Sequence, residues 1–185
     1  VDRLRSRFGS GLLADMHAAE WPARVPVEGA DAYEIPPYDR PAMAIETELL
    51  LDWYVPYLTG RQPGETTRTA FATAWNTVLD RLDGVERSLV LRDYHSPNLV
   101  WRGDRSGNDR LGLIDFQDAL IGPAAYDLAS LAMDARVDIS PELERDTVEA
   151  YRARRTARGG FDRAAFDTAY AIMAAQRNSK ILGIF

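Results

Sequence analysis

Hydrophobic positions recur with helical spacing along most of the chain. The clearest pattern covers residues 71–82, where apolar side chains stand at i, i+4, i+7, i+8 and i+11. Similar spacing predicts helices over residues 8–19 and 46–58, and a final helix that begins near residue 162. Between the first two, residues 21–40 contain four prolines, which forbid a continuous helix there and indicate a loop.

The pattern changes near the middle of the chain. Residues 88–91 form a short apolar run that is typical of a buried strand, and two more runs follow at 99–102 and 111–114. The segment 103–109 is rich in turn formers, so we expect the last two runs to form a β-hairpin. Helical patterns then resume at residues 124–133 and 140–154. The predicted fold class is therefore mainly α with a small β-hairpin insert.

Composition narrows the class of protein. The chain has 185 residues, of which 46% are hydrophobic and 27% charged, so it fits one folded domain or a large part of one. A net charge of −6 argues against binding to a nucleic-acid backbone, and the lack of cysteine excludes thiol chemistry. No apolar run suggests a membrane span and the start has no signal-peptide pattern, so we expect no membrane association and a cytoplasmic location.

Three polar residues surround the predicted hairpin. Asn98 lies just before its first strand and Asp115 just after its second, and the midpoint between them falls inside the turn. Antiparallel pairing should therefore place the two side chains next to each other at the open end. Asp93 precedes Asn98 by five residues, so a compact loop can return it to the same place. Oxygen ligands of this kind suit Mg²⁺, and a nearby carboxylate suits a general base for phosphoryl transfer.

The motifs around these residues carry a resemblance to a known family. The segments LRDYHSPNLVW and LGLIDFQDALIGPAAYDLASL resemble the aminoglycoside phosphotransferase and choline kinase branch of protein kinase-like enzymes. Within it, RDYHSPNL, IDFQDALIGPAAYDLASL and QRNSKILGIF are similar to bacterial cell-wall sugar kinases, which phosphorylate the anomeric hydroxyl of N-acetylmuramate and N-acetylglucosamine. Protein kinases would have Gly after Asp-Phe, where this chain has Gln117.

The resemblance implies roles for individual residues. It makes Asp93 the catalytic base, and Asn98 and Asp115 the ligands of Mg²⁺, with ATP as phosphoryl donor. Asp127 and Arg92 are expected to support the catalytic loop, and Leu91 stands where the family usually has a supporting His.

Other polar and aromatic residues have weaker assignments. Four are candidates for contact with the acceptor: His95, Asp118, Glu48 and Asp52. The alternative is that Glu46, Glu48 and Asp52 form a solvated helix face and that His95 only supports the loop. His17 is expected on a helix surface. The tryptophans at 53, 75 and 101 are expected in the core rather than stacked on a sugar.

These inferences predict the helical catalytic lobe of a kinase-like fold over residues 1–185, with the catalytic loop and metal hairpin at about 88–118. An N-terminal ATP-binding β lobe of the same polypeptide is expected but absent from this chain, whose single lysine, Lys180, lies in the last helix. The predicted enzyme is an ATP-dependent small-molecule kinase with an amino sugar as acceptor. The alternatives are an aminoglycoside or choline-type kinase, and an inactive pseudokinase-like binding module.

Overall fold

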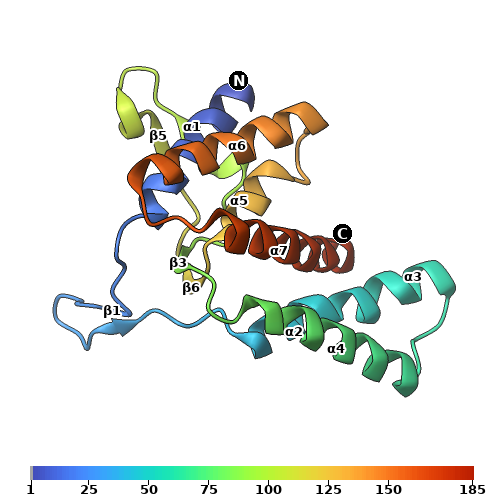
Figure 1. Cartoon of the computed structure of the whole chain (residues 1–185). Helices are drawn as coiled ribbons and strands as arrows, with labels where there is room; N and C mark the ends of the chain where they lie inside the picture. Colours follow the sequence, from blue (N-terminus) through green and yellow to red (C-terminus); the bar gives the residue numbers. More distant parts are fainter. Residues whose placement is uncertain (1) are drawn as a thin grey trace.

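The computed structural model describes residues 2–185, with side chains from residue 7 onward, and it is mostly helical (Figure 1). The helices are α1 (Asp2–His17), α2 (Arg40–Leu49), α3 (Val55–Thr59), α4 (Glu65–Leu79), α5 (Ala125–Ala132), α6 (Pro141–Arg158) and α7 (Arg163–Ile184). The strands are β1 (Arg24–Val25), β2 (Tyr33–Glu34), β3 (Arg87–Val90), β4 (Leu99–Trp101), β5 (Leu111–Leu113) and β6 (Leu120–Pro123). No helix within residues 2–185 has the length and apolar character needed to cross a bilayer.

The helices divide into two groups joined by α7 (Figure 1). Helices α2, α3 and α4 form an arm on one side, while α1, α5 and α6 pack together with the β4–β5 hairpin on the other. Helix α7 contacts both groups, through α2 in the arm and α5 in the main body. Apolar side chains from distant parts of the sequence meet in the core, among them Leu13, Leu128, Tyr151 and Met173.

The predicted hairpin is confirmed with nearly the expected boundaries. Strands β4 and β5 pair antiparallel, with Leu99 opposite Leu113 and Trp101 opposite Leu111. The apolar run at 88–91 is also a strand, β3, and it is buried over Ser88–Val90. Its partner is β6, for which the sequence analysis predicted no strand.

The predicted helices are present, and local capping explains several of their starts. Asp39 accepts a hydrogen bond from the backbone N–H of Ala42 at 3.0 Å, so α2 begins six residues before the expected position 46. A π-helical turn, η1 (Leu50–Tyr54), connects α2 to α3 without a break. At the start of α6, the Ser140 hydroxyl accepts from the N–H of Leu143 at 3.2 Å, as the Ser-Pro pair predicts.

Two expectations about burial are wrong. His17 is buried, and its Nδ1 lies 2.8 Å from the hydroxyl of Tyr151 at the contact of α1 with α6. Burial lowers the pKa of His17 to about 3, so it is a neutral core residue. Trp53 is 66% exposed, because the apolar side of η1 faces a surface groove and not the core. Trp75 and Trp101 do pack against the core, as expected.

Candidate active site

The loop that carries Asp93 begins where β3 ends. Arg92 has a left-handed backbone conformation, with φ of 66°, which is uncommon for a residue with a side chain. The fully buried carboxylate of Asp127 holds this turn by accepting the N–H groups of Leu91 at 2.6 Å and of Arg92 at 3.0 Å. Burial raises the pKa of Asp127 to about 7, although the two backbone N–H groups oppose that shift. Asp127 therefore binds the backbone of the turn that leads to Asp93.

A second carboxylate supports the other half of the loop. Asp134 follows α5 and is buried, and it accepts the N–H of Ser96 at 2.8 Å and that of Arg136 at 2.9 Å. The sequence analysis did not identify this residue. Its only local signal is an acidic side chain directly after an apolar helix, where capping roles are common.

The open end of the β4–β5 hairpin brings the expected polar side chains together. The amide nitrogen of Asn98 lies 3.0 Å from the backbone oxygen of Asp93 and 3.5 Å from a carboxylate oxygen of Asp115. The other oxygen of Asp115 accepts from Gln117 at 2.7 Å. Asp115 has a φ of 61°, so its carboxylate is presented from a strained backbone, a feature that is common at functional sites.

This donor set fits a magnesium ion better than a protein-enclosed metal centre. Among the described side chains, no three His, Cys, Asp or Glu residues gather as a metal site. Asn98 and Asp115 instead bring one carboxamide group and one carboxylate together at the end of the hairpin, where Asp115 is exposed. Mg²⁺ is commonly held by one or two protein ligands while water and phosphate complete its shell.

His95 and Asp118 differ sharply in exposure. His95 is 4% exposed, and its Nε2 lies 3.4 Å from the amide nitrogen of Asn98. Burial lowers the pKa of His95, and the positive charge of Arg136 lowers it further. Asp118 is exposed just beyond Asp115. His95 thus lies beside Asn98, and Asp118 follows Asp115 by three residues, so both candidates belong to the segments that meet at the open end of the β4–β5 hairpin.

Glu46 does not belong to a solvated helix face, which corrects the expectation for this residue. It is 6% exposed and accepts hydrogen bonds from Arg92 at 2.5 Å, Lys180 at 2.7 Å, Tyr38 at 2.5 Å and Gln176 at 3.1 Å. Burial alone would raise the pKa of Glu46, but Lys180 and the other donors lower it overall. Glu46 on α2 thereby links the loop at Arg92 to α7.

The two other acidic candidates on this arm lie in more exposed positions. Glu48 is exposed, and Asp52 pairs with Arg68 of α4 at 2.8 Å. The carboxylate of Asp52 is therefore engaged within the helical arm rather than with the loop at 91–98.

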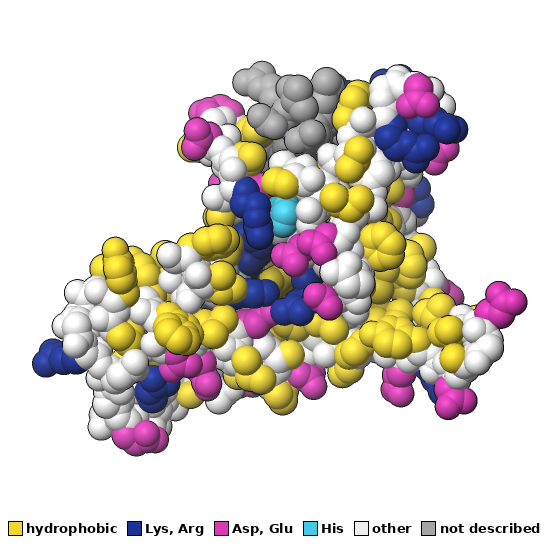
Figure 2. Space-filling view, turned by 180° about the vertical axis from the view of Figure 1, so that it is seen from behind, with side chains coloured by type: hydrophobic (Ala, Val, Ile, Leu, Met, Phe, Trp, Pro, Cys, Tyr) yellow, Lys and Arg dark blue, Asp and Glu magenta, His cyan; other side chains and the backbone are white. Residues whose placement is uncertain are grey.

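The opposite side of the molecule from Figure 1 has a hollow between the helical arm and the main body (Figure 2). Basic and acidic side chains gather in this hollow, together with a histidine, and hydrophobic surface surrounds them. Charged side chains of both signs are therefore concentrated in this recess.

Comparison with known proteins identifies the family. The phosphotransferase enzyme family matches residues 11–166, which is most of the chain. The chain belongs to this family. The matched residues include Asp93 and Asn98 of the loop, Asp115 at the end of the hairpin, and Asp127 of α5.

Individual relatives of this chain carry more specific names. An N-acetylmuramate/N-acetylglucosamine kinase from Caulobacter vibrioides is 33% identical over 95% of this chain and 47% of its own length. One from Neisseria meningitidis is 35% identical over 82% of this chain and 45% of its own length. The chain thus spans about half the length of the curated relatives it matches.

A solved structure supports the kinase-like fold. A choline/ethanolamine kinase family protein from Mesorhizobium loti aligns with 97% of this chain and 51% of its own, with a TM-score of 0.57 at 15% identity. The mainly helical phosphotransferase fold predicted from the sequence is confirmed at this level.

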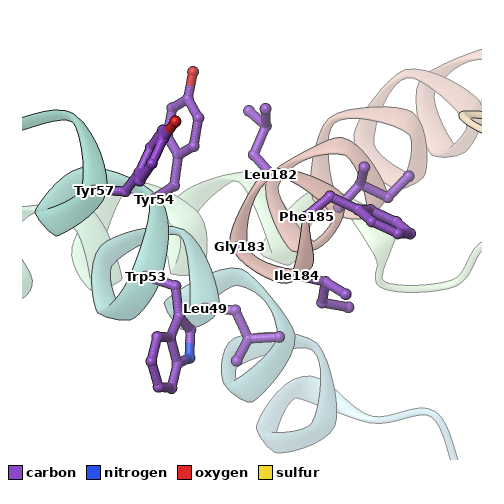
Figure 3. Close-up of a pocket in the computed structure, with 9 residues that line it drawn as sticks. Leu49, Trp53, Tyr54, Tyr57, Leu182, Gly183, Ile184 and Phe185 are labelled. Carbon is purple, nitrogen blue, oxygen red and sulfur yellow. The ribbon is translucent and has the colours of Figure 1, made fainter.

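The structure also has an apolar groove of about 640 Å³ next to the junction of the arm with α7 (Figure 3). Leu49, Trp53 and Tyr57 line one wall, and residues 181–185 form the other. The two backbones approach so closely that a Cβ on Gly183 would lie 2.4 Å from the carbonyl carbon of Leu49. Glycine is therefore required at the floor of the groove.

Proposed function

We propose that this phosphotransferase transfers the γ-phosphoryl group of ATP to a hydroxyl of an amino sugar, with N-acetylmuramate and N-acetylglucosamine as the favoured acceptors. The observation that carries the proposal is the convergence of Asn98, Asp115 and the Asp93 loop in a chain whose relatives are named as kinases of those sugars. Phosphoryl transfer depends mainly on positioning and charge neutralisation, which this arrangement can supply.

We propose separate roles for the three polar residues. Asp93 accepts the proton of the attacking sugar hydroxyl, while Asn98 and Asp115 would hold Mg²⁺. The supports below the loop, Asp127 and Asp134, fix the backbone on either side of Asp93 without touching the substrate. The ion would neutralise negative charge that develops on the transferred phosphoryl group.

We propose that an ATP-binding lobe, formed by another part of the same polypeptide, holds the ATP phosphates. The relatives are about twice as long as the matched region, which leaves room for such a lobe. The single lysine of this chain is engaged elsewhere, since Lys180 is paired with Glu46 at 2.7 Å. We therefore propose that residues 1–185 form the catalytic helical lobe.

The direct test compares acceptors in the protein at its full natural length. We expect ATP- and Mg²⁺-dependent phosphorylation of N-acetylmuramate or N-acetylglucosamine, with a higher kcat/KM than for kanamycin or choline. Replacing Glu48 and Asp52 together by Gln and Asn should change sugar turnover little, whereas an aminoglycoside kinase that used these carboxylates to bind a polycation would be crippled. Preferential turnover of kanamycin or choline would favour the alternative acceptors, and Mg²⁺-dependent nucleotide binding without any turnover would favour a binding module.

A further inference from the structure

Asp93 directly follows a tight turn centred on Arg92. The N–H of Asp93 donates to the backbone oxygen of Leu91 at 2.8 Å, and this hydrogen bond closes a γ-turn. With a φ of 66° at its central residue, the turn belongs to the rare and strained form of that class. Such a conformation persists only where surrounding contacts hold it. The position of Asp93 therefore depends on what holds Arg92.

Two carboxylates hold this turn, and they act on different parts of it. Asp127 accepts the backbone N–H groups of Leu91 and Arg92, so it fixes the peptide groups that enter the turn. Glu46 accepts from the guanidinium of Arg92 at 2.5 Å, so it fixes the side chain at the centre of the turn. The direction of a side chain relative to the preceding backbone depends on φ at its own residue. The ion pair with Glu46 therefore opposes the relaxation of Arg92 to a negative φ.

Glu46 is itself held from several directions. One of its carboxylate oxygens accepts from Arg92 and from Lys180 at 2.7 Å. The other accepts from Tyr38 at 2.5 Å and from Gln176 at 3.1 Å. The side chain is buried, which limits competition from water for these hydrogen bonds. A carboxylate with four donors around it has little freedom to turn, so Glu46 is a rigid anchor for Arg92.

We propose that Glu46 is a positioning residue for phosphoryl transfer: through Arg92 it holds the turn that places the carboxylate of Asp93 against the acceptor hydroxyl. The inference rests on the proposed function, in which Asp93 accepts the proton of that hydroxyl. A general base must lie within hydrogen-bond reach of the proton that it removes. A displacement of about 1 Å, caused by a change away from the reacting atoms, can lower the rate about 10²-fold.

The experiment compares two substitutions of the same kind in the protein at its full natural length. Glu46→Gln should lower kcat by about tenfold to a hundredfold, with little change in the KM for ATP or for the sugar. Glu86→Gln is the matched control, because Glu86 pairs with Arg155 at 2.5 Å, as Glu46 does with Arg92, and each pair has one buried partner. Glu86 lies just before β3, at the end of the strand away from Asp93, so this variant should lose stability and keep its kcat.

A double substitution separates positioning from a general structural effect. If Glu46 acts through Asp93, Glu46→Gln should lower kcat little further once Asp93→Asn has removed the base. A merely structural role would lower kcat by the same factor in both backgrounds. Arg92→Gln leaves Glu46 paired with Lys180, so it should lower kcat as Glu46→Gln does, and it replaces that variant if the latter does not fold.

Amide hydrogen exchange gives a reading that does not require turnover. Exchange over residues 91–95 should be faster in Glu46→Gln than in wild type or Glu86→Gln, because the turn opens more often. If the wild type phosphorylates neither sugar, the proposed function fails, and exchange over this segment still decides whether Glu46 holds the turn. Unchanged exchange would then overturn the positioning role as well. In an active enzyme, a wild-type kcat in Glu46→Gln, or a loss of kcat that is undiminished in the Asp93→Asn background, would overturn the proposal.

Discussion

The amide nitrogen of Asn98 lies 3.5 Å from the carboxylate of Asp115, although the two residues are 17 positions apart in the sequence. The β4–β5 hairpin produces this contact, because its register pairs Leu99 with Leu113 and leaves the two polar residues at the open end. A short element of local structure thus creates the proposed metal site.

The metal assignment predicts unequal effects for the two ligands. Asp115→Ala should abolish Mg²⁺-dependent nucleotide binding, because this carboxylate would join the ion to the phosphates. Asn98→Ala should weaken binding less, since a neutral amide is the weaker ligand. Nucleotide titrations at several Mg²⁺ concentrations measure both effects. Asp104→Ala, in the exposed hairpin turn, is the control and should leave the titrations unchanged. If Asp115→Ala and Asn98→Ala also leave them unchanged, the metal site is excluded.

The base assignment predicts a loss of rate without a loss of binding. Asp93→Asn should lower kcat on the order of 10²-fold or more, because general-base catalysis typically contributes that much. Nucleotide affinity should stay close to the wild-type value, since Asp93 is not proposed as a metal ligand. Steady-state kinetics and a binding titration on the same preparation separate the two quantities. Near-normal turnover would show that another group accepts the proton.

The buried carboxylate of Asp127 predicts a pH dependence of stability. Its pKa is raised from 3.8 to about 7, so the folded state holds the proton more tightly than the unfolded state does. The contribution of Asp127 to the free energy of unfolding is therefore largest below about pH 4 and declines as the pH rises toward 7. Asp127→Asn cannot titrate, so the stability advantage of wild type over this variant should shrink between pH 5 and pH 8.

Asp15 provides the control of opposite sign. The Arg154 hydrogen bond lowers the pKa of Asp15 to about 2, so its contribution is present above pH 4 and is lost only below it. The difference between wild type and Asp15→Asn should therefore stay constant from pH 5 to pH 8. Denaturant titrations at the two pH values give both differences. A wild-type advantage over Asp127→Asn that grows with pH would contradict the assignment.

The Glu46 cluster predicts a large loss of stability from a small chemical change. Glu46→Gln should lower the free energy of unfolding by about 3 kcal/mol, because it leaves the charges of Arg92 and Lys180 without their partner. Glu48 lies two positions away on the exposed side of the same helix. Glu48→Gln should therefore change the free energy of unfolding by less than about 0.5 kcal/mol. Equal effects in the two variants would mean that the cluster contributes nothing to folding.

The contrast between the hairpin and this cluster shows how far the sequence could predict the structure. The hairpin depends on turn formers and strand register within a few residues, so the meeting of Asn98 and Asp115 could be predicted. The contact of Glu46 with Lys180 joins residues 134 positions apart, and no local pattern encodes that distance. A weak signal existed, because Glu46 follows the buried Met43 by three residues and therefore shares its helix face.

Periodicity also identified apolar faces without saying what covers them. Trp53 on the apolar side of residues 46–58 was expected in the core, yet it lines an open groove together with Tyr57. The groove exists because the helical arm and the end of α7 lie side by side without closing over these side chains. That arrangement depends on the whole fold and not on the local sequence. The same limitation applies to His17, whose burial depends on the packing of α1 against Tyr151 of α6.

Lys180 gives this chain an unusual response to chemical labelling. It is the single lysine of the sequence, and in the folded protein its amine is partly buried against Glu46. Reagents that acylate amines should therefore modify this side chain slowly while the protein is native and rapidly once α7 separates from α2. The mass added at one residue would then report, without any introduced probe, how often the contact between the helical arm and the main body opens.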